Sequence, residues 1–295
     1  MKLHLPITLL TAVLAACIAL PAQAVEAPEG YTTTYLNSPG TLENYSSLTS
    51  SERIAFILED SQEITPSGAD YWTSYTPLVR GGHVFFGSYN SDSPVALSFK
   101  DGNGLAFCDQ SALTFDTLSN LTFSTITGNS AAISVGNGTL TITNVNDGQS
   151  DTVDVLFKDI KNTSSAGGAI YARDGDVTIS NNSDVSFSGN SSYSYGSSYS
   201  DSYGGAIYAY SGLTIQGNDS VLFEKNYEDS SGVYRLRSIY NDGTQGMTLS
   251  AKTGGNITFY DSVYSSGATY LNRNYTDAEG NTQSADGDVI FSGKY

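Results

Sequence analysis

Residues that could carry out chemistry are few in this chain and lie far apart. The two histidines are His4, near the N-terminus, and His83, so a nucleophile–histidine–acid arrangement is hard to assemble. Two Asp-Gly-Asp sequences, at 174–176 and 286–288, bring carboxylates together in pairs, as acid–base catalysis or calcium binding would require. Asp-Gly is first of all turn chemistry, and we interpret both as turns between strands, with weak calcium binding and catalysis as alternatives. The pattern predicts no catalytic residue, no metal site and no cofactor.

The charge of the chain excludes one class of partner. Its 295 residues include 13 lysines and arginines against 30 aspartates and glutamates, a formal net charge of −17 at neutral pH. Such an acidic surface repels phosphate backbones, so we predict no binding to nucleic acid. Aromatic residues make up 12% of the chain, which is too many for a solvated disordered tail and indicates a folded protein.

The N-terminus has the pattern of an export signal. Lys2 precedes an apolar stretch, and Ala-Gln-Ala at 22–24 provides a cleavage site, so residues 1–24 are predicted to be a signal peptide. The alternative is a lipoprotein signal in which Cys17 carries the lipid. No later stretch approaches the ~18 apolar residues of a transmembrane helix. After cleavage Cys108 is the one remaining cysteine, which predicts a buried structural thiol and no disulfide within the chain.

The chain repeats itself at intervals of 30 to 37 residues. Gly-Gly-Ala-Ile at 167–170 returns at 204–207, and each copy is followed by an alternating strand. Each unit closes with a second alternating strand that ends in Phe-x-x-Asn, at 187–190 and 223–226. One unit is therefore predicted to contain three short strands. The repeat residues with predicted structural roles are Gly168, Ala169, Ile170, Phe187, Asn190, Gly205, Ala206, Ile207, Phe223 and Asn226.

Three apolar columns run through the repeats. The first contains Ile133, Ile170, Ile207 and Ile239, the second Ile142, Ile179, Ile215 and Leu249, and the third Phe123, Phe157, Phe187, Phe223, Phe259 and Phe291. Before them, four phenylalanines follow one another at steps of eight, which indicates a coil with almost no loop. These are Phe99, Phe107, Phe115 and Phe123.

The columns predict an all-β fold, a right-handed parallel β-helix (a solenoid) with an N-terminal cap. Stacking three-strand coils places like residues over like residues and completes each backbone hydrogen-bond ladder, so we expect about five to seven coils. An antiparallel sandwich or barrel is the alternative, but its turns would recur at shorter spacing without a longer period. We expect the Gly-Gly pairs to form tight corners with positive φ, and the asparagines of Phe-x-x-Asn to occupy left-handed corners and stack their amides.

Residues 25–82 lack the period and are predicted to form the N-terminal cap. The first coil of a solenoid must be shielded from water and from pairing at its edge, which is the natural role of such a segment. It contains the single tryptophan, Trp72, and a helix-like stretch at 50–58, with an N-cap serine and apolar residues on one face. The repeats are assigned to residues 83–295.

The paired motifs carry a family likeness. Gly-Gly-Ala-Ile followed by Phe-x-x-Asn, at 167–190 and 204–226, resembles the repeats of the chlamydial polymorphic outer-membrane proteins, a group of autotransporter passengers. The likeness covers about residues 105–295. It implies a β-helical passenger at the cell surface or outer membrane, or secreted, with adhesion as its usual role. Such proteins end in a translocator barrel, for which this chain leaves no room, so none is expected within it.

The leading hypothesis is therefore a non-enzymatic exported passenger, an adhesin or a cell-surface structural protein. Its predicted partner is a protein or glycan on a host or cell surface. The alternative is a polysaccharide-active, pectin-lyase-like enzyme, because parallel β-helices also host such enzymes. That function would need a groove with convergent carboxylates and at least one cation.

One segment between the repeats is suited to contact a partner. Residues 191–203 fall between Phe-x-x-Asn and the next Gly-Gly, so they are expected to loop out of the stack. They are rich in Tyr, Ser and Gly, which together form adaptable contact surfaces. The alternative is a low-complexity insertion that is tolerated because long loops cost little free energy. The predicted contact residues are Tyr193, Tyr195, Tyr199 and Tyr203.

Overall fold

The computed structural model describes most of the chain after the predicted signal peptide. The described residues are 27–66, 77–103, 106–149, 152–163, 166–194, 203–230, 232–277 and 279–293. The predicted signal peptide at 1–24, with Cys17, and also Trp72, Tyr195 and Tyr199 lie outside them. Among the residues described, no helix has the length and apolarity needed to cross a membrane.

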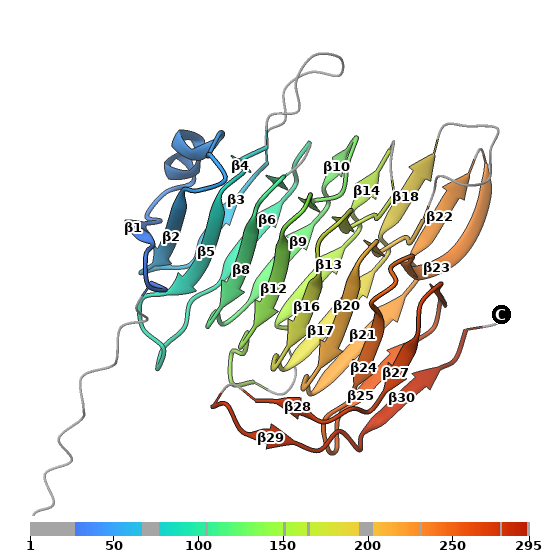
Figure 1. Ribbon diagram of the computed structural model, residues 1–295. Coiled ribbons are helices and arrows are strands. Elements are labelled where there is room, and N and C mark those ends of the chain that lie inside the picture. Colours follow the sequence, from blue (N-terminus) through green and yellow to red (C-terminus); the bar gives the residue numbers. More distant parts are fainter. Residues whose placement is uncertain are drawn as a thin grey trace, which may run out of the picture.

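The described residues form a stack of coils, all-β apart from one 3-10 helix, η1 (Pro39–Tyr45) (Figure 1). Three large sheets run along the stack, and nearly all their strands pair in parallel with the coil before and the coil after. This is the parallel β-helix that the columns predict. The eight-stranded sheet alone contains eight layers, more than the five to seven expected, because strands that precede the recognisable repeats also join the stack.

The strands of the three sheets follow one another in each coil. The nine-stranded sheet contains β1 (Thr32–Tyr35), β2 (Arg53–Leu58), β5 (His83–Ser88), β8 (Ala112–Asp116), β12 (Thr139–Thr143), β16 (Val177–Ser180), β20 (Gly212–Gln216), β24 (Gly246–Ser250) and β27 (Thr269–Leu271). The eight-stranded sheet contains β3 (Gln62–Ile64), β6 (Leu97–Lys100), β9 (Leu121–Ser124), β13 (Val155–Lys158), β17 (Asp184–Ser188), β21 (Ser220–Glu224), β25 (Asn256–Phe259) and β30 (Asp288–Phe291).

The eleven-stranded sheet has two arms. The coil arm closes each coil and contains β4 (Val79–Arg80), β7 (Phe107–Cys108), β11 (Ile133–Val135), β15 (Ile170–Ala172) and β19 (Ile207–Ala209). The outer arm contains β10 (Thr127–Gly128), β14 (Lys161–Asn162), β18 (Ser191–Ser194) and β22 (Tyr227–Ser230). The long strand β23 (Val233–Asn241) joins the arms, antiparallel to β22 and parallel to β19, and β26 (Ser262–Ser265) pairs with it. A separate hairpin consists of β28 (Tyr275–Thr276) and β29 (Thr282–Gln283).

The three predicted apolar columns are confirmed as in-register ladders. The Ile133 column pairs through the coil arm, the Ile142 column through the nine-stranded sheet and the Phe123 column through the eight-stranded sheet. Neighbouring phenylalanine rings of the third column lie 4.7 to 5.2 Å apart and nearly parallel. The four phenylalanines at steps of eight complete one turn, since Phe99 stacks on Phe123 at 4.7 Å.

The helix expected at residues 50–58 is wrong, because Arg53–Leu58 form strand β2. Alternate residues of β2 point into the core, but the outward-facing Ala55 and Ile57 are buried too, against Ala27 and Tyr31. Apolar residues on both faces of a strand give the spacing that imitates a helical face. Strands β2, β3 and β4 already lie in the three sheets, so parallel pairing begins before residue 83.

Residues before β2 cover the first coil. Leu36 and Leu42, the latter in η1, are fully buried in the main core. The ring of Tyr45 packs edge-on against Phe56 at 5.0 Å. Phe56 in turn stacks on Phe86, so these residues shield the end of an aromatic column from water.

In the central coils, two corners each have one residue with positive φ. At the first corner, between the nine- and eight-stranded sheets, these are Thr117, Asn144, Asn181 and Gly217, with φ of 52 to 67°. At the second corner, after the eight-stranded sheet, they are Asp101, Thr125, Asp159, Gly189 and Lys225, with φ of 53 to 69°. The residue directly after each of these positive-φ residues faces the core and is buried. In successive coils it changes from aliphatic to asparagine, as in Ile126, Ile160, Asn190 and Asn226.

The asparagines of Phe-x-x-Asn form a buried amide column, but not in the left-handed conformation. Asn190 Nδ2 donates to Asn226 Oδ1 at 2.9 Å, and Asn226 Nδ2 donates to Asp261 Oδ2 at 3.1 Å. Asn190 Oδ1 also accepts the Ile160 N–H at 3.2 Å. The left-handed residue is the one before each asparagine, Gly189 or Lys225. An equivalent pair, Asn182 and Asn218, lies at the first corner.

The two glycines of each Gly-Gly pair have different roles. The first, Gly167 or Gly204, has a φ of 68°, a conformation that other residues adopt at a cost. The second, Gly168, has ordinary φ, but a Cβ there would collide with the carbonyl oxygen of Gly205 in the next coil. The pair therefore lets the chain enter the coil arm with two coils in close contact.

Truncation of one core ring should destabilise the protein strongly. Phe223 is fully buried and stacks at 4.8 Å on both Phe187 and Phe259. We expect Phe223→Ala to lower the free energy of unfolding in urea by about 3–5 kcal/mol. The matched control is Leu222→Ala, because Leu222 is only half-buried on the outer face of the same strand. Equal losses for the two variants would contradict the inward ladder.

A single glycine substitution should stabilise the second corner. Lys225 has a φ of 56°, whereas Gly189 occupies the equivalent position of the preceding coil. Lys225→Gly removes the cost of a left-handed side-chain-bearing residue, so we expect a gain of about 0.5–1 kcal/mol in the free energy of unfolding. The reverse change at the neighbouring coil, Gly189→Ala, should be destabilising. A destabilising effect of Lys225→Gly would show that the lysine side chain is needed there.

Candidate contact surface

The outer surface of the coil arm carries a ladder of tyrosines. Tyr171 on β15, Tyr208 on β19, Tyr240 on β23 and Tyr264 on β26 are in register. Their alternate neighbours, such as Ile170 and Ala172, point inward, so the rings point outward. Successive ring centroids lie 5.2, 5.9 and 4.3 Å apart with interplanar angles of 13 to 20°.

A fifth tyrosine comes from residues 191–203, which we call the Tyr/Ser segment. The ring of Tyr203 lies 4.1 Å from that of Tyr240 and 5.8 Å from that of Tyr208. Tyr208 is only 8% exposed, whereas Tyr264, at the end of the ladder, is 40% exposed. Burial raises the pKa of the Tyr208 and Tyr240 phenols above its ordinary value. We call these five residues, Tyr171, Tyr203, Tyr208, Tyr240 and Tyr264, the tyrosine face.

An ion pair lies beside the tyrosine face. Arg237 Nη1 contacts Glu228 Oε1 at 2.9 Å, and the same oxygen accepts the N–H of Gly204 at 3.0 Å. Burial raises the pKa of Glu228, while Arg237 opposes that shift. The guanidinium also lies 5.5 Å from the ring centre of Tyr240 and 5.8 Å from that of Tyr264. The pair thus connects the outer arm, the Gly-Gly corner and the aromatic ladder.

The predicted contact loop is shorter than residues 191–203. Residues 191–194 form β18, which pairs with β14 and β22, and Tyr193 lies in this strand opposite Asp229. The fold therefore continues to Ser194, and the expected departure at Asn190 is wrong, because in four successive coils the outer arm adds a strand after the second corner. Of the four predicted tyrosines, the structure brings Tyr203 to the tyrosine face and leaves Tyr193 in the outer arm.

The other four members of the tyrosine face were missed in the sequence. A signal for three of them was present, since an isoleucine of the first column precedes tyrosine at 170–171, 207–208 and 239–240. In a strand, the residue after an inward isoleucine points outward. A repeated Ile-Tyr at the repeat period therefore indicates an external aromatic ladder.

Residues considered for catalysis are dispersed. Asp176 Oδ1 accepts the Gly212 N–H at 2.8 Å, and Asp174 pairs with Arg173, consistent with a turn. Thr253 donates to Asp286 in the second Asp-Gly-Asp. In the part of the chain that the structure describes, no three His, Cys, Asp or Glu residues are close enough to hold a metal ion. Cys108 is half-buried, and burial raises the pKa of its thiol to about 12.

One carboxyl has a markedly raised pKa. Asp154 is fully buried, and burial raises its pKa to about 6 although it accepts the N–H groups of Asp147 and Asp184, at 3.2 and 3.3 Å. A raised pKa is typical of general acids, but a carboxyl closed off from solvent cannot reach a substrate. We therefore interpret Asp154 as a structural residue at the start of β13.

Fold and surface together define a parallel β-helical repeat protein with an external aromatic ladder. Residues 184–210 match the Chlamydia polymorphic membrane protein repeat. The match runs from β17 through the Tyr/Ser segment to the end of β19, so it includes Tyr203 and Tyr208. The chain is thus similar to a family of surface and autotransporter passenger proteins. No curated protein and no solved structure matches the chain.

Asp154 should give the protein a pH-dependent stability. Below about pH 4 its carboxyl is protonated in the folded and unfolded chains; between about pH 4 and pH 6 only the unfolded chain ionises, so stability falls. A shift of this size corresponds to about 2–3 kcal/mol, and Asp154→Asn should remove that part of the slope. Urea unfolding at pH 4, 5, 6 and 7 measures it. Asp174→Asn, at an exposed carboxylate, is the control and should keep the slope of the parent.

Proposed function

We propose that the protein is an exported, non-enzymatic β-helical passenger that acts as an adhesin through the tyrosine face. The predicted signal peptide at 1–24 supports export, to the cell surface, the outer membrane or the medium. The repeat match supports a surface role. The observation that carries the proposal is the stacked tyrosine ladder, which presents aromatic side chains on the outside of a rigid sheet.

The physical argument rests on pre-organisation. Aromatic side chains contribute large contact area for few rotatable bonds, and they dominate binding energy in many protein interfaces. The ladder holds Tyr208 and Tyr240 in fixed positions, because each of these rings is stacked on its neighbours and its strand is paired on both sides. Tyr203, the last residue of the predicted contact segment, has its ring 4.1 Å from that of Tyr240, so one of the predicted contact residues belongs to the ladder.

The test compares two exposed tyrosines of the same strand region. Tyr264 belongs to the tyrosine face, whereas Tyr260, 54% exposed, follows β25 outside it. Beads coated with the purified protein are applied to cultured animal cells. We expect Tyr264→Ala together with Tyr203→Ser to lower the number of bound beads at least fivefold, as the loss of about 1 kcal/mol would. Tyr260→Ala should bind like the parent. Equal adhesion by all three proteins would contradict the proposal.

Deletion of the loop gives a second readout. Replacement of residues 195–202 by a short Gly-Ser link leaves β18 and Tyr203 in place and should leave the melting temperature nearly unchanged. If this variant binds as well as the parent, the loop is a tolerated insertion and the ladder alone makes the contact.

The non-enzymatic assignment is checked separately. Release of reducing ends from a pectin and glycan panel with Ca²⁺, abolished by one Asp substitution, would show an enzyme.

A further inference from the structure

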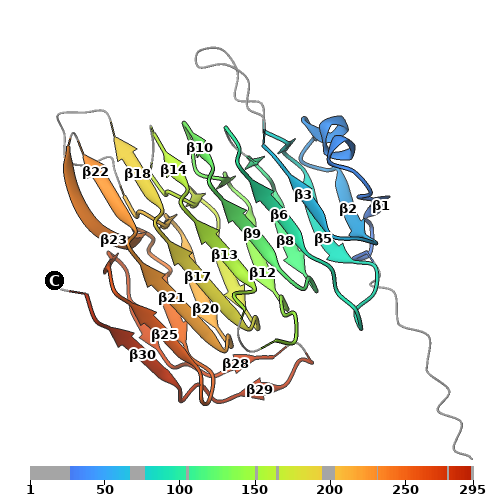
Figure 2. The ribbon, with the colours of Figure 1, turned by 180° about the vertical axis from the view of Figure 1, so that it is seen from behind.

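A second surface lies at the other side of the stack, where the β28–β29 hairpin folds back along the first corner (Figures 1 and 2). Between hairpin and corner is a groove of about 410 Å³, within the range of small-molecule sites. Its corner side includes Asn144, Asn181 and Gly217, one from each of three successive coils. Its hairpin side includes Asp277 and Gln283. We call it the corner groove.

The hairpin is held on the corner by one aromatic contact. Tyr275 is 9% exposed, and a Cβ on Gly217 would come within 2.6 Å of its Cε2 atom. Gly217 therefore leaves room for the tyrosine ring, where the preceding coils have Asn144 and Asn181. The corner groove is open beside this contact, so the hairpin covers the corner only in part.

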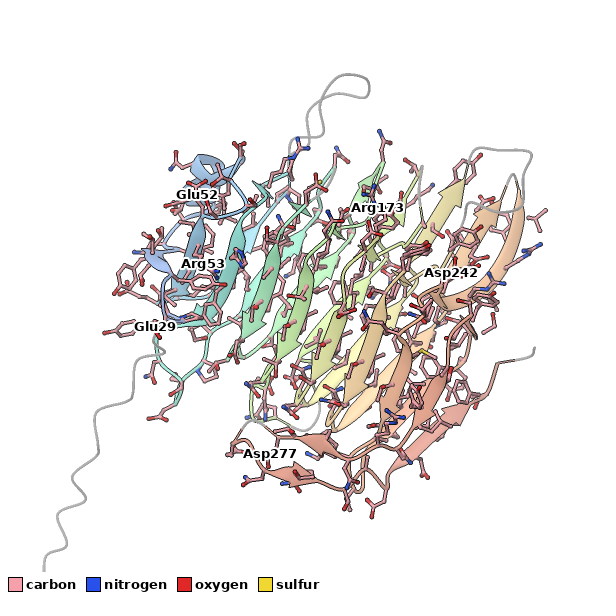
Figure 3. The ribbon with its side chains drawn as sticks, in the orientation of Figure 1. Glu29, Glu52, Arg53, Arg173, Asp242 and Asp277 are labelled. Atoms are coloured by element: carbon pink, nitrogen blue, oxygen red, sulfur yellow. The ribbon has the colours of Figure 1, made fainter. Side chains whose placement is uncertain are left out.

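The polar groups of the corner groove are fixed by the fold. Asp277 accepts the Asn281 N–H at 2.7 Å and the Gln283 side-chain amide at 2.6 Å. Asn181 stands on a corner backbone with a φ of 57°, above the buried Asn182–Asn218 pair. Its side-chain amide makes no hydrogen bond to any described residue, so its donor and acceptor are left for a ligand. Figure 3 shows Asp277 on the hairpin, at the lower edge of the stack.

The lining excludes several ligand classes. Its side chains are amides, hydroxyls and charged groups with one largely buried ring, so it lacks the apolar walls of a drug-like pocket. Three carboxylates, Asp219, Asp277 and Glu279, face one cation, Lys252, which already pairs with Asp219. The hydrogen bonds from Asn281 and Gln283 lower the pKa of Asp277, so it remains ionised. An anionic ligand would therefore be repelled.

We propose that the corner groove binds an uncharged oligosaccharide. Sugar hydroxyls both donate and accept hydrogen bonds, and they match side-chain amides that do the same and carboxylates that accept. Asn144 and Asn181 lie on successive coils about 4.8 Å apart, so a ligand lying along the corner meets two amides in turn, the first of which also donates from Nδ2 to Asp116 Oδ1 at 2.8 Å. A peptide would find neither apolar pockets for its side chains nor, on the paired strands flanking the corner, a free edge.

The test uses calorimetric titration of the full exported chain with defined hexasaccharides. The uncharged probes are N-acetylchitohexaose, maltohexaose and cellohexaose, and the charged probes are a heparin hexasaccharide and hexalysine. We expect at least one uncharged hexasaccharide to bind and the heparin probe not to. Asn181→Gly removes the free amide and keeps the backbone, since Gly217 is native at the equivalent position, and should weaken binding about tenfold.

Two control proteins and one further groove variant locate the binding. Asp159→Gly changes an exposed left-handed residue in the same way at the second corner, away from the corner groove, and should leave affinity unchanged. Gln283→Ala alters the hairpin side and should weaken binding severalfold. The double variant with Tyr203→Ser and Tyr264→Ala should bind the hexasaccharide like the parent. The proposal for the corner groove and the proposal for the tyrosine face are therefore tested independently.

Three results would overturn the proposal. The first is that no uncharged hexasaccharide binds at millimolar concentration. The second is that binding occurs but is unchanged in both Asn181→Gly and Gln283→Ala, which would place the sugar elsewhere. The third is that the heparin probe binds as well as the uncharged ones, or that hexalysine alone binds, which would make the corner groove a site for charged ligands.

Discussion

Backbone hydrogen bonding between successive coils is the constraint on which this structure depends. Because nearly all strands of the large sheets pair in parallel with the coil before and after, a residue lies directly over its equivalent in the next coil. Each position must therefore hold a side chain that can pack against an equivalent side chain in the next coil, about 4.8 Å away. Phenylalanine satisfies this by stacking its rings, isoleucine by packing and asparagine by an amide chain.

Both proposed contact regions derive from this same constraint. Repetition that stacks phenylalanine inside also stacks Tyr208 and Tyr240 outside, and repetition of the first corner aligns Asn144 with Asn181. What makes each region distinctive is a segment that departs from the repeat. The Tyr/Ser segment brings Tyr203 onto the ladder, and the β28–β29 hairpin closes one side of the corner groove.

The columns could be predicted from the sequence because equivalent positions of stacked coils pair in register, and these positions recur along the chain as the same residue types. The polar outer arm could not, since Lys161–Asn162 and Thr127–Gly128 have neither apolar alternation nor sufficient length. Strand β2 was mistaken for a helix because its outward residues are covered by residues 27–31, which no local pattern reveals. The corner groove joins positions 144 to 283, and only the folded hairpin brings them together.

The buried amide column has a sense along the stack. Each asparagine amide donates one N–H to the side chain of the C-terminal coil and the other to a backbone carbonyl of the N-terminal coil. Its oxygen accepts from the N-terminal coil, and the series ends on the carboxylate of Asp261. The N–H of Ile160 is consequently satisfied by a side chain that belongs to the following coil. The coil of Ile160 thus depends on the following coil for one of its backbone hydrogen bonds, and Asn190 of that following coil depends in return on the carbonyl oxygen of Phe157, so neighbouring coils complete each other's hydrogen bonding.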